Sequence, residues 1–210
     1  MPLYKTISLD QQTQIFVWKI TESFDELFRE LALKDVSLAR LENMKSESHQ
    51  KGFLSVRKLL NVAGFSDFDL YYDEFGKPHL HNGTHISISH SHGFSVIIIS
   101  NRNVGIDLEM RREKIEIIAH KFAEEEFVYL TKENKTDYIS KLTVIWGIKE
   151  AVFKVRNEVG ISFKDHIFVA PFEITDKKTG ALLHFNNLKV TFEVQFEEIE
   201  NYTVVWVFEK

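Results

Sequence analysis

Two segments of this chain, one with the pattern of a strand and one with the pattern of a helix, constrain its fold most strongly. In Val104–Met110, apolar residues alternate with Gly105, Asp107 and Glu109. A strand would place the two carboxylates on one face, where Gly105 would leave room for a ligand. About forty residues later, Tyr138–Val155 carries apolar residues at helical spacing. The sequence therefore predicts a half-buried strand followed by a long amphipathic helix.

The predicted helix and strand carry a set of charged residues that suits a hard cation. Trp146, Glu150 and Lys154 follow one another at four-residue steps, so they share one face of the helix. Taken singly, Glu150 and Lys154 could be a surface ion pair, and Asp107 and Glu109 a solvated strand face. Taken together, three carboxylates in a chain without cysteine are typical ligands of Mg²⁺, which shares its coordination with phosphates.

A third polar element lies upstream of the acidic strand. Ser89 and His90 end a run in which isoleucines and serines alternate, so the isoleucines are expected in the core. His90 lies where the pattern gives way to a polar turn, which is a position suited to contacting an anion. Lys77 lies on the preceding turn and offers a positive charge. A single histidine at a strand end is often structural, so both interpretations of His90 stay open.

Composition excludes several classes of protein. The 210 residues include no Cys, which rules out disulfides and thiolate metal sites and fits a reducing compartment. The N-terminus lacks a basic segment followed by an apolar run, so no signal peptide is expected. Apolar stretches such as Ser95–Ile99 are too short to span a bilayer. The net charge of −5 gives no support for nucleic-acid binding. We therefore expect a cytoplasmic protein with no membrane or nucleic-acid partner.

The predicted elements occur in a similar order in both halves of the chain, namely a strand, then helices, then short strands. The expected strands are Gln14–Ile20, Phe68–Tyr72, Pro78–His81, His85–Ser100, Val104–Met110, Ile167–Ile174, Ala181–Phe185, Leu188–Glu197 and Tyr202–Glu209. The expected helices are one capped by Ser23 and Glu26, then Ser46–Ala63, Lys114–Leu130 and Tyr138–Val155. We expect an α+β protein of two lobes, residues 1–102 and 103–210.

These motifs resemble those of the 4′-phosphopantetheinyl transferase superfamily, in its two-lobed type that activates acyl and peptidyl carrier proteins. That family carries Gly-x-Asp-x-Glu and, about forty residues later, Trp-x-x-Lys-Glu-Ala/Ser-x-x-Lys. This chain has both, at Gly105–Glu109 and Trp146–Lys154, with Gly76–Pro78 and Ser89–Ser91 upstream. The resemblance implies two similar lobes related by a pseudo-two-fold, each with helices packed on a small, mainly antiparallel sheet. It also implies that coenzyme A binds in the cleft between the lobes.

The resemblance implies a reaction and the residues that perform it. The 4′-phosphopantetheine arm of coenzyme A would pass to a serine of an apo carrier protein, with release of 3′,5′-ADP. Asp107, Glu109 and Glu150 would hold Mg²⁺ against the pyrophosphate of coenzyme A. Glu150 would also serve as the catalytic base. Lys149 and Lys154 would neutralise phosphate charge, with Lys154 near the bond that breaks.

The resemblance also implies contacts at the nucleotide end of coenzyme A, and there the chain departs from the family pattern. Lys77, Ser89 and His90 would form these contacts, with His90 at the 3′-phosphate. The family tends to have an arginine four residues before the Phe-Leu of the long N-terminal helix, where this chain has His49. Lys51 or Arg57 is a candidate substitute. Gly147 also departs, since the family usually has Ser, Cys or Thr there, but we expect little effect because each of these residues is small.

The partner and the assembly follow from charge and length. A basic run, Lys45, Lys51, Arg57 and Lys58, predicts where an acidic carrier protein docks. A monomer is expected because one chain would supply both lobes. Two alternatives remain open. One is a relative that binds coenzyme A or a carrier protein without turnover. The other is a zinc hydrolase built on the histidines at positions 79, 81, 85, 90 and 92, which has no matching acidic ligand nearby in the sequence.

Overall fold

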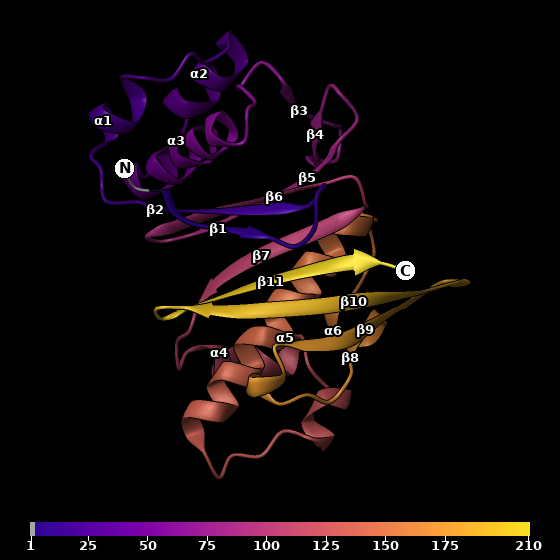
Figure 1. The fold of residues 1–210 in the computed structure, drawn as a ribbon. Coiled ribbons are helices and arrows are strands. Elements are labelled where there is room, and N and C mark those ends of the chain that lie inside the picture. The colour runs from indigo at the N-terminus through magenta and orange to yellow at the C-terminus, as the bar shows by residue number, and fades with distance from the viewer. Residues whose placement is uncertain (1–2) are drawn as a thin grey trace. The chain divides into compact units, whose positions relative to one another are not determined.

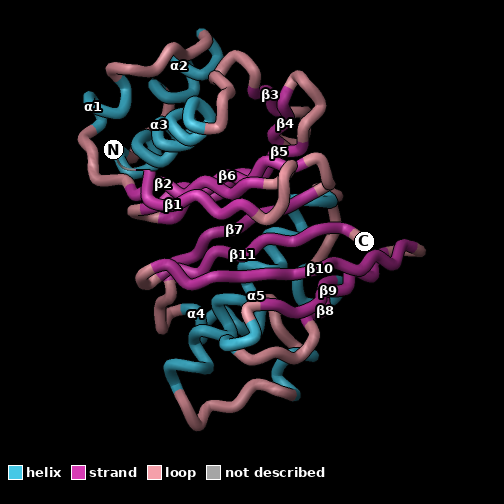
Figure 2. The backbone as a smooth tube through the Cα atoms, in the orientation of Figure 1, coloured by secondary structure: helices cyan, strands magenta, loops and turns pink. Residues whose placement is uncertain are grey.

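The chain folds into two compact units, the first ending at Arg102 and the second beginning at Asn103. The computed structural model describes residues 3–210. Each unit combines helices with an antiparallel sheet (Figures 1 and 2), which confirms the predicted α+β class. The expected two-fold relation between the units stays a prediction.

The first unit is built on a four-stranded sheet in the order β1-β2-β6-β5. Its strands are β1 (Leu3–Ser8), β2 (Gln14–Lys19), β5 (His85–Ser91) and β6 (Phe94–Ser100). Helix α3 (Glu47–Val62) packs on this sheet, as Figure 1 shows, and buries apolar side chains such as Phe53, Val56 and Leu60. The unit also contains α1 (Phe24–Phe28), α2 (Asp35–Glu42), β3 (Leu70–Tyr72) and β4 (Pro78–Leu80).

The helix signals read from the sequence of the first unit are confirmed. Ser23 caps α1, and its side chain accepts a hydrogen bond from the backbone N–H of Glu26, whose carboxylate accepts one from the backbone N–H of Ser23. Helix α3 begins and ends within one residue of the predicted bounds. Strand β1 was not predicted, although alternation over Leu3–Ser8 was available as a signal, and α2 was also missed.

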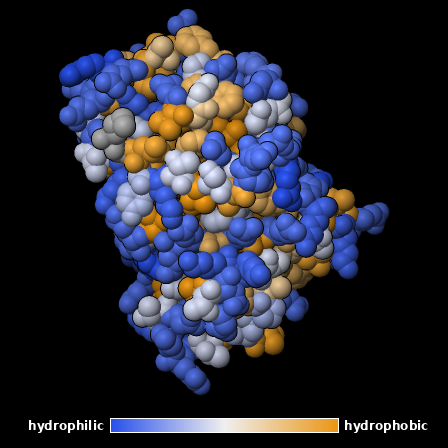
Figure 3. Space-filling model, in the orientation of Figure 1, coloured by the Kyte–Doolittle hydropathy of each residue, from blue (hydrophilic) through white to orange (hydrophobic). Residues whose placement is uncertain are grey.

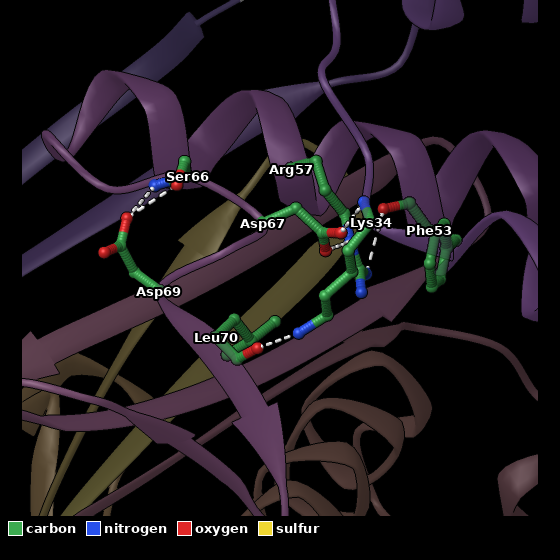
Figure 4. Close-up of polar contacts among 7 residues, drawn as sticks. All are labelled: Lys34, Phe53, Arg57, Ser66, Asp67, Asp69 and Leu70. Atoms are coloured by element: carbon green, nitrogen blue, oxygen red, sulfur yellow. Dashed lines mark hydrogen bonds and ion pairs between the residues drawn. The ribbon is translucent and has the colours of Figure 1, made fainter. Parts of the chain in front are cut away.

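Arg57 of α3 does not belong to a docking surface, contrary to the expectation. Its guanidinium donates through Nε to the Asp67 carboxylate at 3.0 Å, and both side chains are buried (Figure 4). The same group lies 3.4 Å from the ring centroid of Phe53, and Asp67 also accepts the backbone N–H of Lys34. Arg57 therefore fixes α3 to the loop that follows it, and neither the carrier protein nor a nucleotide can reach its charge. Lys58, in contrast, pairs with an exposed carboxylate, that of Glu30.

The second unit is built on a five-stranded sheet in the order β7-β11-β10-β9-β8. The strands are β7 (Val104–Met110), β8 (Ile167–Val169), β9 (Lys178–Phe185), β10 (Leu188–Ile199) and β11 (Tyr202–Glu209). Figure 2 shows the long helix α5 (Lys135–Arg156) crossing this sheet. The core lies between α5 and one face of the sheet, because alternate residues of β10 (Val190, Phe192, Val194 and Phe196) are buried.

Helix α5 confirms the predicted helix and extends it at the N-terminal end. The Asn134 side chain caps it by accepting the backbone N–H groups of Thr136 and Asp137, and Asn157 ends it in the left-handed conformation. The predicted apolar stripe of Ile145, Ile148, Val152 and Val155 is buried. This stripe lets α5 pack tightly enough to bring its polar residues close to β7.

Three predicted elements are wrong in detail. His85–Ser100 is a hairpin of β5 and β6, because His92 adopts a φ of 48° and turns the chain. Lys114–Leu130 is broken into α4 (Ile115–Ile118) and two single turns, η1 (Ala119–Lys121) and η2 (Glu125–Val128). Ile167–Ile174 contains only the short β8, followed by the turn η3 (Ile174–Asp176).

Hydrophilic side chains cover most of the molecular face seen in Figure 3, and apolar side chains interrupt them in small groups. Within residues 3–210, no helix has the length and hydropathy needed to cross a membrane.

Candidate active site

The site begins where β7 and α5 come into close contact, at Gly105. A β-carbon built on Gly105 would lie 2.1 Å from the backbone oxygen of Ala151 and 2.9 Å from Val155 Cγ2. The missing side chain therefore makes room for the helix backbone. This corrects the expectation that Gly105 leaves space for a ligand, because the face of β7 that carries Asp107 and Glu109 is the face on which α5 packs.

Strand β7 and helix α5 run in opposite directions, and their polar residues meet in pairs. Lys154 Nζ donates to Asp107 Oδ1 at 2.8 Å and to the Ile106 carbonyl at 3.0 Å. At the other end of the contact, Trp146 Nε1 donates to Glu109 Oε1 at 3.1 Å. Glu150 lies between Trp146 and Lys154 on the same helix face, one turn from each. The structure thus brings together the three carboxylates and the lysine that the sequence placed on two separate elements.

Asp107 is close enough to both glutamates to perturb their pKa values. Burial and the Asp107 charge raise the pKa of Glu109 from 4.5 to about 7, and Glu150 contributes in the same direction. Burial and the Asp107 charge also raise the pKa of Glu150 to about 7, against an opposing effect of Lys154. The site therefore concentrates negative charge in a partly dehydrated environment, with Lys154 as a local counter-ion.

Aromatic packing fixes the Trp146 indole that bonds Glu109. The rings of Phe122 and Phe163 lie 5.1 and 5.5 Å from the Trp146 ring, centroid to centroid. Gly147 allows the next close approach, since a β-carbon there would lie 2.9 Å from Val205 Cγ2 and 3.6 Å from Asp107 Oδ2. A larger residue at 147 would therefore press on β11, which makes Gly147 less replaceable than its small size suggested.

Lys149 does not join the carboxylate group. Its side chain is 0% exposed, and Nζ contacts Glu126 Oε1 at 2.8 Å and donates to the Phe163 carbonyl at 3.0 Å. Glu126 Oε1 also accepts the backbone N–H of Val169. Burial lowers the pKa of Lys149, and the Glu126 charge opposes this shift. In this structure Lys149 ties α5 to η2 and to the backbone of Phe163, so the expected phosphate contact of Lys149 would require this ion pair to open.

Glu126 is a residue that sequence reasoning missed. It lies in a segment predicted to be a helix, Lys114–Leu130, where an acidic side chain is expected on the solvent face. Instead its carboxylate is 1% exposed and satisfies both Lys149 and the backbone of β8. The inward turn of Glu126 accompanies the break of the predicted helix into η1 and η2.

Breaking the buried pair should destabilise the second unit. Lys149→Met leaves the Glu126 carboxylate buried without its counter-ion, so we expect the free energy of unfolding to fall by about 3 kcal/mol or more. Urea denaturation followed by circular dichroism measures this loss. Lys164→Met is the matched control, because Lys164 pairs with Glu124 at 2.7 Å on the surface and should contribute less than about 1 kcal/mol. Equal losses in the two variants would contradict the structural role of Lys149.

The donor set at β7 and α5 has the chemistry that Mg²⁺ prefers. Asp107, Glu109 and Glu150 supply only oxygen atoms, and their accumulated charge favours a divalent cation. Within residues 3–210, no group of three His, Asp or Glu side chains is already arranged as metal ligands. Lys154 instead neutralises Asp107. The residues fit such an ion by type and proximity, and their side chains would have to converge to hold it.

The remaining expected site residues lie in the first unit. Lys77 is half-buried in the turn between β3 and β4, and its backbone N–H donates to Asp73 Oδ1 at 2.9 Å. Ser89 is buried and His90 is exposed, both near the end of β5. The His90 ring lies against α3, with its centroid 6.4 Å from that of His49. The structure thus brings His90 to the position at which the family arginine is replaced.

Comparisons with known proteins agree with these motifs. Residues 103–207 match the sequence model of the 4′-phosphopantetheinyl transferase superfamily. A curated relative from Aneurinibacillus migulanus, the 4′-phosphopantetheinyl transferase gsp, is 30% identical over 161 residues. That match covers 74% of this chain and 66% of the relative, so the chain spans just under two thirds of the relative's length. The family match contains β7 and α5, which carry the candidate site.

Proposed function

The chain belongs to the 4′-phosphopantetheinyl transferase superfamily, and we propose that it transfers the 4′-phosphopantetheine arm of coenzyme A to a serine of an apo carrier protein, with Mg²⁺. The observation that carries this proposal is the packing of β7 against α5, which brings Asp107, Glu109, Glu150 and Lys154 to one place. We also propose that it acts as a monomer in the cytoplasm.

In the proposed site, the acidic residues bind the cation and the basic residue binds phosphate. Asp107, Glu109 and Glu150 would hold the cation, which when bound would neutralise the pyrophosphate and polarise the phosphoryl group under attack. Lys154 is 28% exposed, so its ammonium can leave Asp107 for a phosphate oxygen. Trp146 holds one oxygen of Glu109 and thereby orients the other. Lys149, which is buried in an ion pair with Glu126, supports α5 in this proposal.

The proposed reaction is a direct phosphoryl transfer. The serine oxygen of the carrier protein forms a bond to the β-phosphorus of coenzyme A, while the bond from that phosphorus to the bridging oxygen breaks. The electron pair leaves with 3′,5′-ADP, and the serine proton passes to Glu150, directly or through water. The half-buried position of Glu150 beside Asp107, which raises its pKa to about 7, supports a base that can accept a proton near neutral pH.

In the first unit, the proposed contacts go to the nucleotide end of coenzyme A. His90 is exposed at the end of β5, and His49 of α3 lies beside it, so both imidazoles are accessible to a phosphate from the same side of the helix. Lys77 and Ser89 complete the proposed set. Ser89 is 8% exposed, so its role would be to support His90 at least as much as to contact the nucleotide.

Intact-mass measurement of the carrier protein tests the proposed function. The chain is incubated with coenzyme A, Mg²⁺ and several apo carrier proteins, and each carrier is followed for the added phosphopantetheine. We expect at least one carrier to gain the arm, with loss of the gain when EDTA replaces Mg²⁺. Binding of coenzyme A without any gain in mass would contradict transfer and would favour a relative that binds its ligand without turnover.

A further inference from the structure

Gly52 is an unusual residue for its place in the fold. It lies inside the 16-residue helix α3 and is buried. Glycine in a helix interior is less favourable than alanine, because it loses more backbone freedom on folding and contributes no side chain to the packing. Gly52 adopts no positive φ, so the helix conformation itself does not require glycine. The reason for glycine must therefore lie in what surrounds it.

The neighbour of Gly52 is the His90 ring. A β-carbon built on Gly52 would lie 3.1 Å from His90 Nδ1, 3.2 Å from Cγ and 3.5 Å from Cε1, and these are its three nearest atoms. The first two distances are shorter than an ordinary van der Waals contact between such atoms. His49 is three residues before Gly52 on the same helix face, and its ring centroid lies 6.4 Å from that of His90. The imidazole of His90 thus lies in the space left by the missing side chain.

The helix cannot easily move away from the strand at this point. The hydroxyl of Ser55 donates to the Gly52 carbonyl at 2.8 Å and lies 2.6 Å from the hydroxyl of Ser95. Both serines are 0% exposed, and Ser95 of β6 is the register partner of His90. A buried chain of hydrogen bonds therefore fixes the distance between α3 and the sheet next to His90. A side chain added at position 52 would displace the ring and leave the backbone in place.

We propose that Gly52 is a positioning residue that seats the His90 imidazole against α3 and so holds it where it meets coenzyme A. The inference rests on the proposed function, since it deepens the part that assigns His90 to the nucleotide end. It adds a residue that the motifs do not include, and it accounts for an unfavourable helix residue beside an exposed histidine.

Isothermal titration calorimetry with coenzyme A tests whether Gly52 positions His90 for binding. The measurement needs no carrier protein. We expect Gly52→Ala to weaken binding about three- to tenfold, as when a charge-assisted hydrogen bond is weakened without being lost. Its melting temperature should equal or exceed that of the wild type, because alanine favours the helix. Asn61→Ala is the matched control: it also favours α3, is exposed and lies away from His90, so the affinity should not change.

A double-mutant cycle shows whether Gly52 acts through His90. In a His90→Ala background, Gly52→Ala should change the dissociation constant less than about twofold, since the group that it displaces is gone. Unchanged affinity in the single variant, or the same loss in both backgrounds, would overturn the inference. If the wild type binds no coenzyme A, the proposed function fails. The NMR resonances of the His90 ring then test separately whether Gly52 positions that ring against α3. A shift in Gly52→Ala but not in Asn61→Ala supports it, and unchanged resonances overturn it.

Discussion

Neutralising either of two carboxylates, in Asp107→Asn or Glu150→Gln, should lower kcat/KM for transfer by about a thousandfold or more. Each change keeps the size of the side chain and removes a charge from the cluster that would hold the cation, at a cost of several kcal/mol in the transition state. Glu150→Gln should leave the fold intact or slightly more stable, because it relieves repulsion from Asp107. Steady-state kinetics with an accepted carrier protein measures the loss.

Glu133→Gln is the matched control for these variants. Glu133 is an exposed carboxylate in the turn before α5. Its replacement by Gln removes the same charge from the same unit and leaves the carboxylate cluster unchanged. Its kcat/KM should remain within about twofold of the wild type, in line with the small effect expected of a screened surface charge. Wild-type turnover in Glu150→Gln would show that the chemistry takes place elsewhere.

Gly105→Ala should destabilise the second unit by more than about 4 kcal/mol, in the range that only severe structural conflicts reach. The new β-carbon would lie 2.1 Å from the Ala151 oxygen, and this is a backbone atom in the middle of α5 that no rotamer change can move. Relief would require α5 to separate from β7, which also separates Lys154 from Asp107. Urea denaturation measures the loss, and a fall in soluble expression is the expected outcome at the extreme.

Gly180→Ala provides the contrast within the same sheet. A β-carbon on Gly180 of β9 would lie 3.8 Å from the Phe192 oxygen, which is an ordinary contact. The change should alter the free energy of unfolding by less than about 1 kcal/mol, because the only cost is an ordinary contact and alanine lowers the conformational entropy of the unfolded chain. If Gly105→Ala were as stable as Gly180→Ala, the close packing of α5 on β7 would be wrong.

The elements that form the site could be predicted because their sequences carry strong local patterns. Alternation predicted the bounds of Val104–Met110 to the residue. The apolar stripe predicted α5 and the neighbouring helix face that carries Trp146, Glu150 and Lys154. The type of cation followed from residue types, because three carboxylates without cysteine favour Mg²⁺, whereas the reaction followed only from the resemblance to the family. The bounds of these two elements needed only the periodicity of each segment and no knowledge of how the segments pack.

Other features depend on contacts between distant segments, and the sequence does not show those. Arg57 looks like one more basic residue beside Lys58, and only the packing of α3 against its following loop buries it with Asp67. From the sequence, Lys149 and Glu126 each resemble solvent-exposed charged residues, and only the packing of η2 against α5 buries them as a pair. The sequence predicts that Gly105 leaves space for a ligand, although the backbone of α5 fills that space.

The most direct test of the account is a crystal structure with coenzyme A and Mn²⁺ in place of Mg²⁺, in which anomalous scattering locates the ion. We expect one ion bound by oxygens of Asp107, Glu109 and Glu150 at about 2.1–2.2 Å, close to the octahedral distances of small divalent ions, with Lys154 turned from Asp107 to a phosphate oxygen. An ion held by other residues, with these three carboxylates still directed away from it, would contradict the proposed metal site.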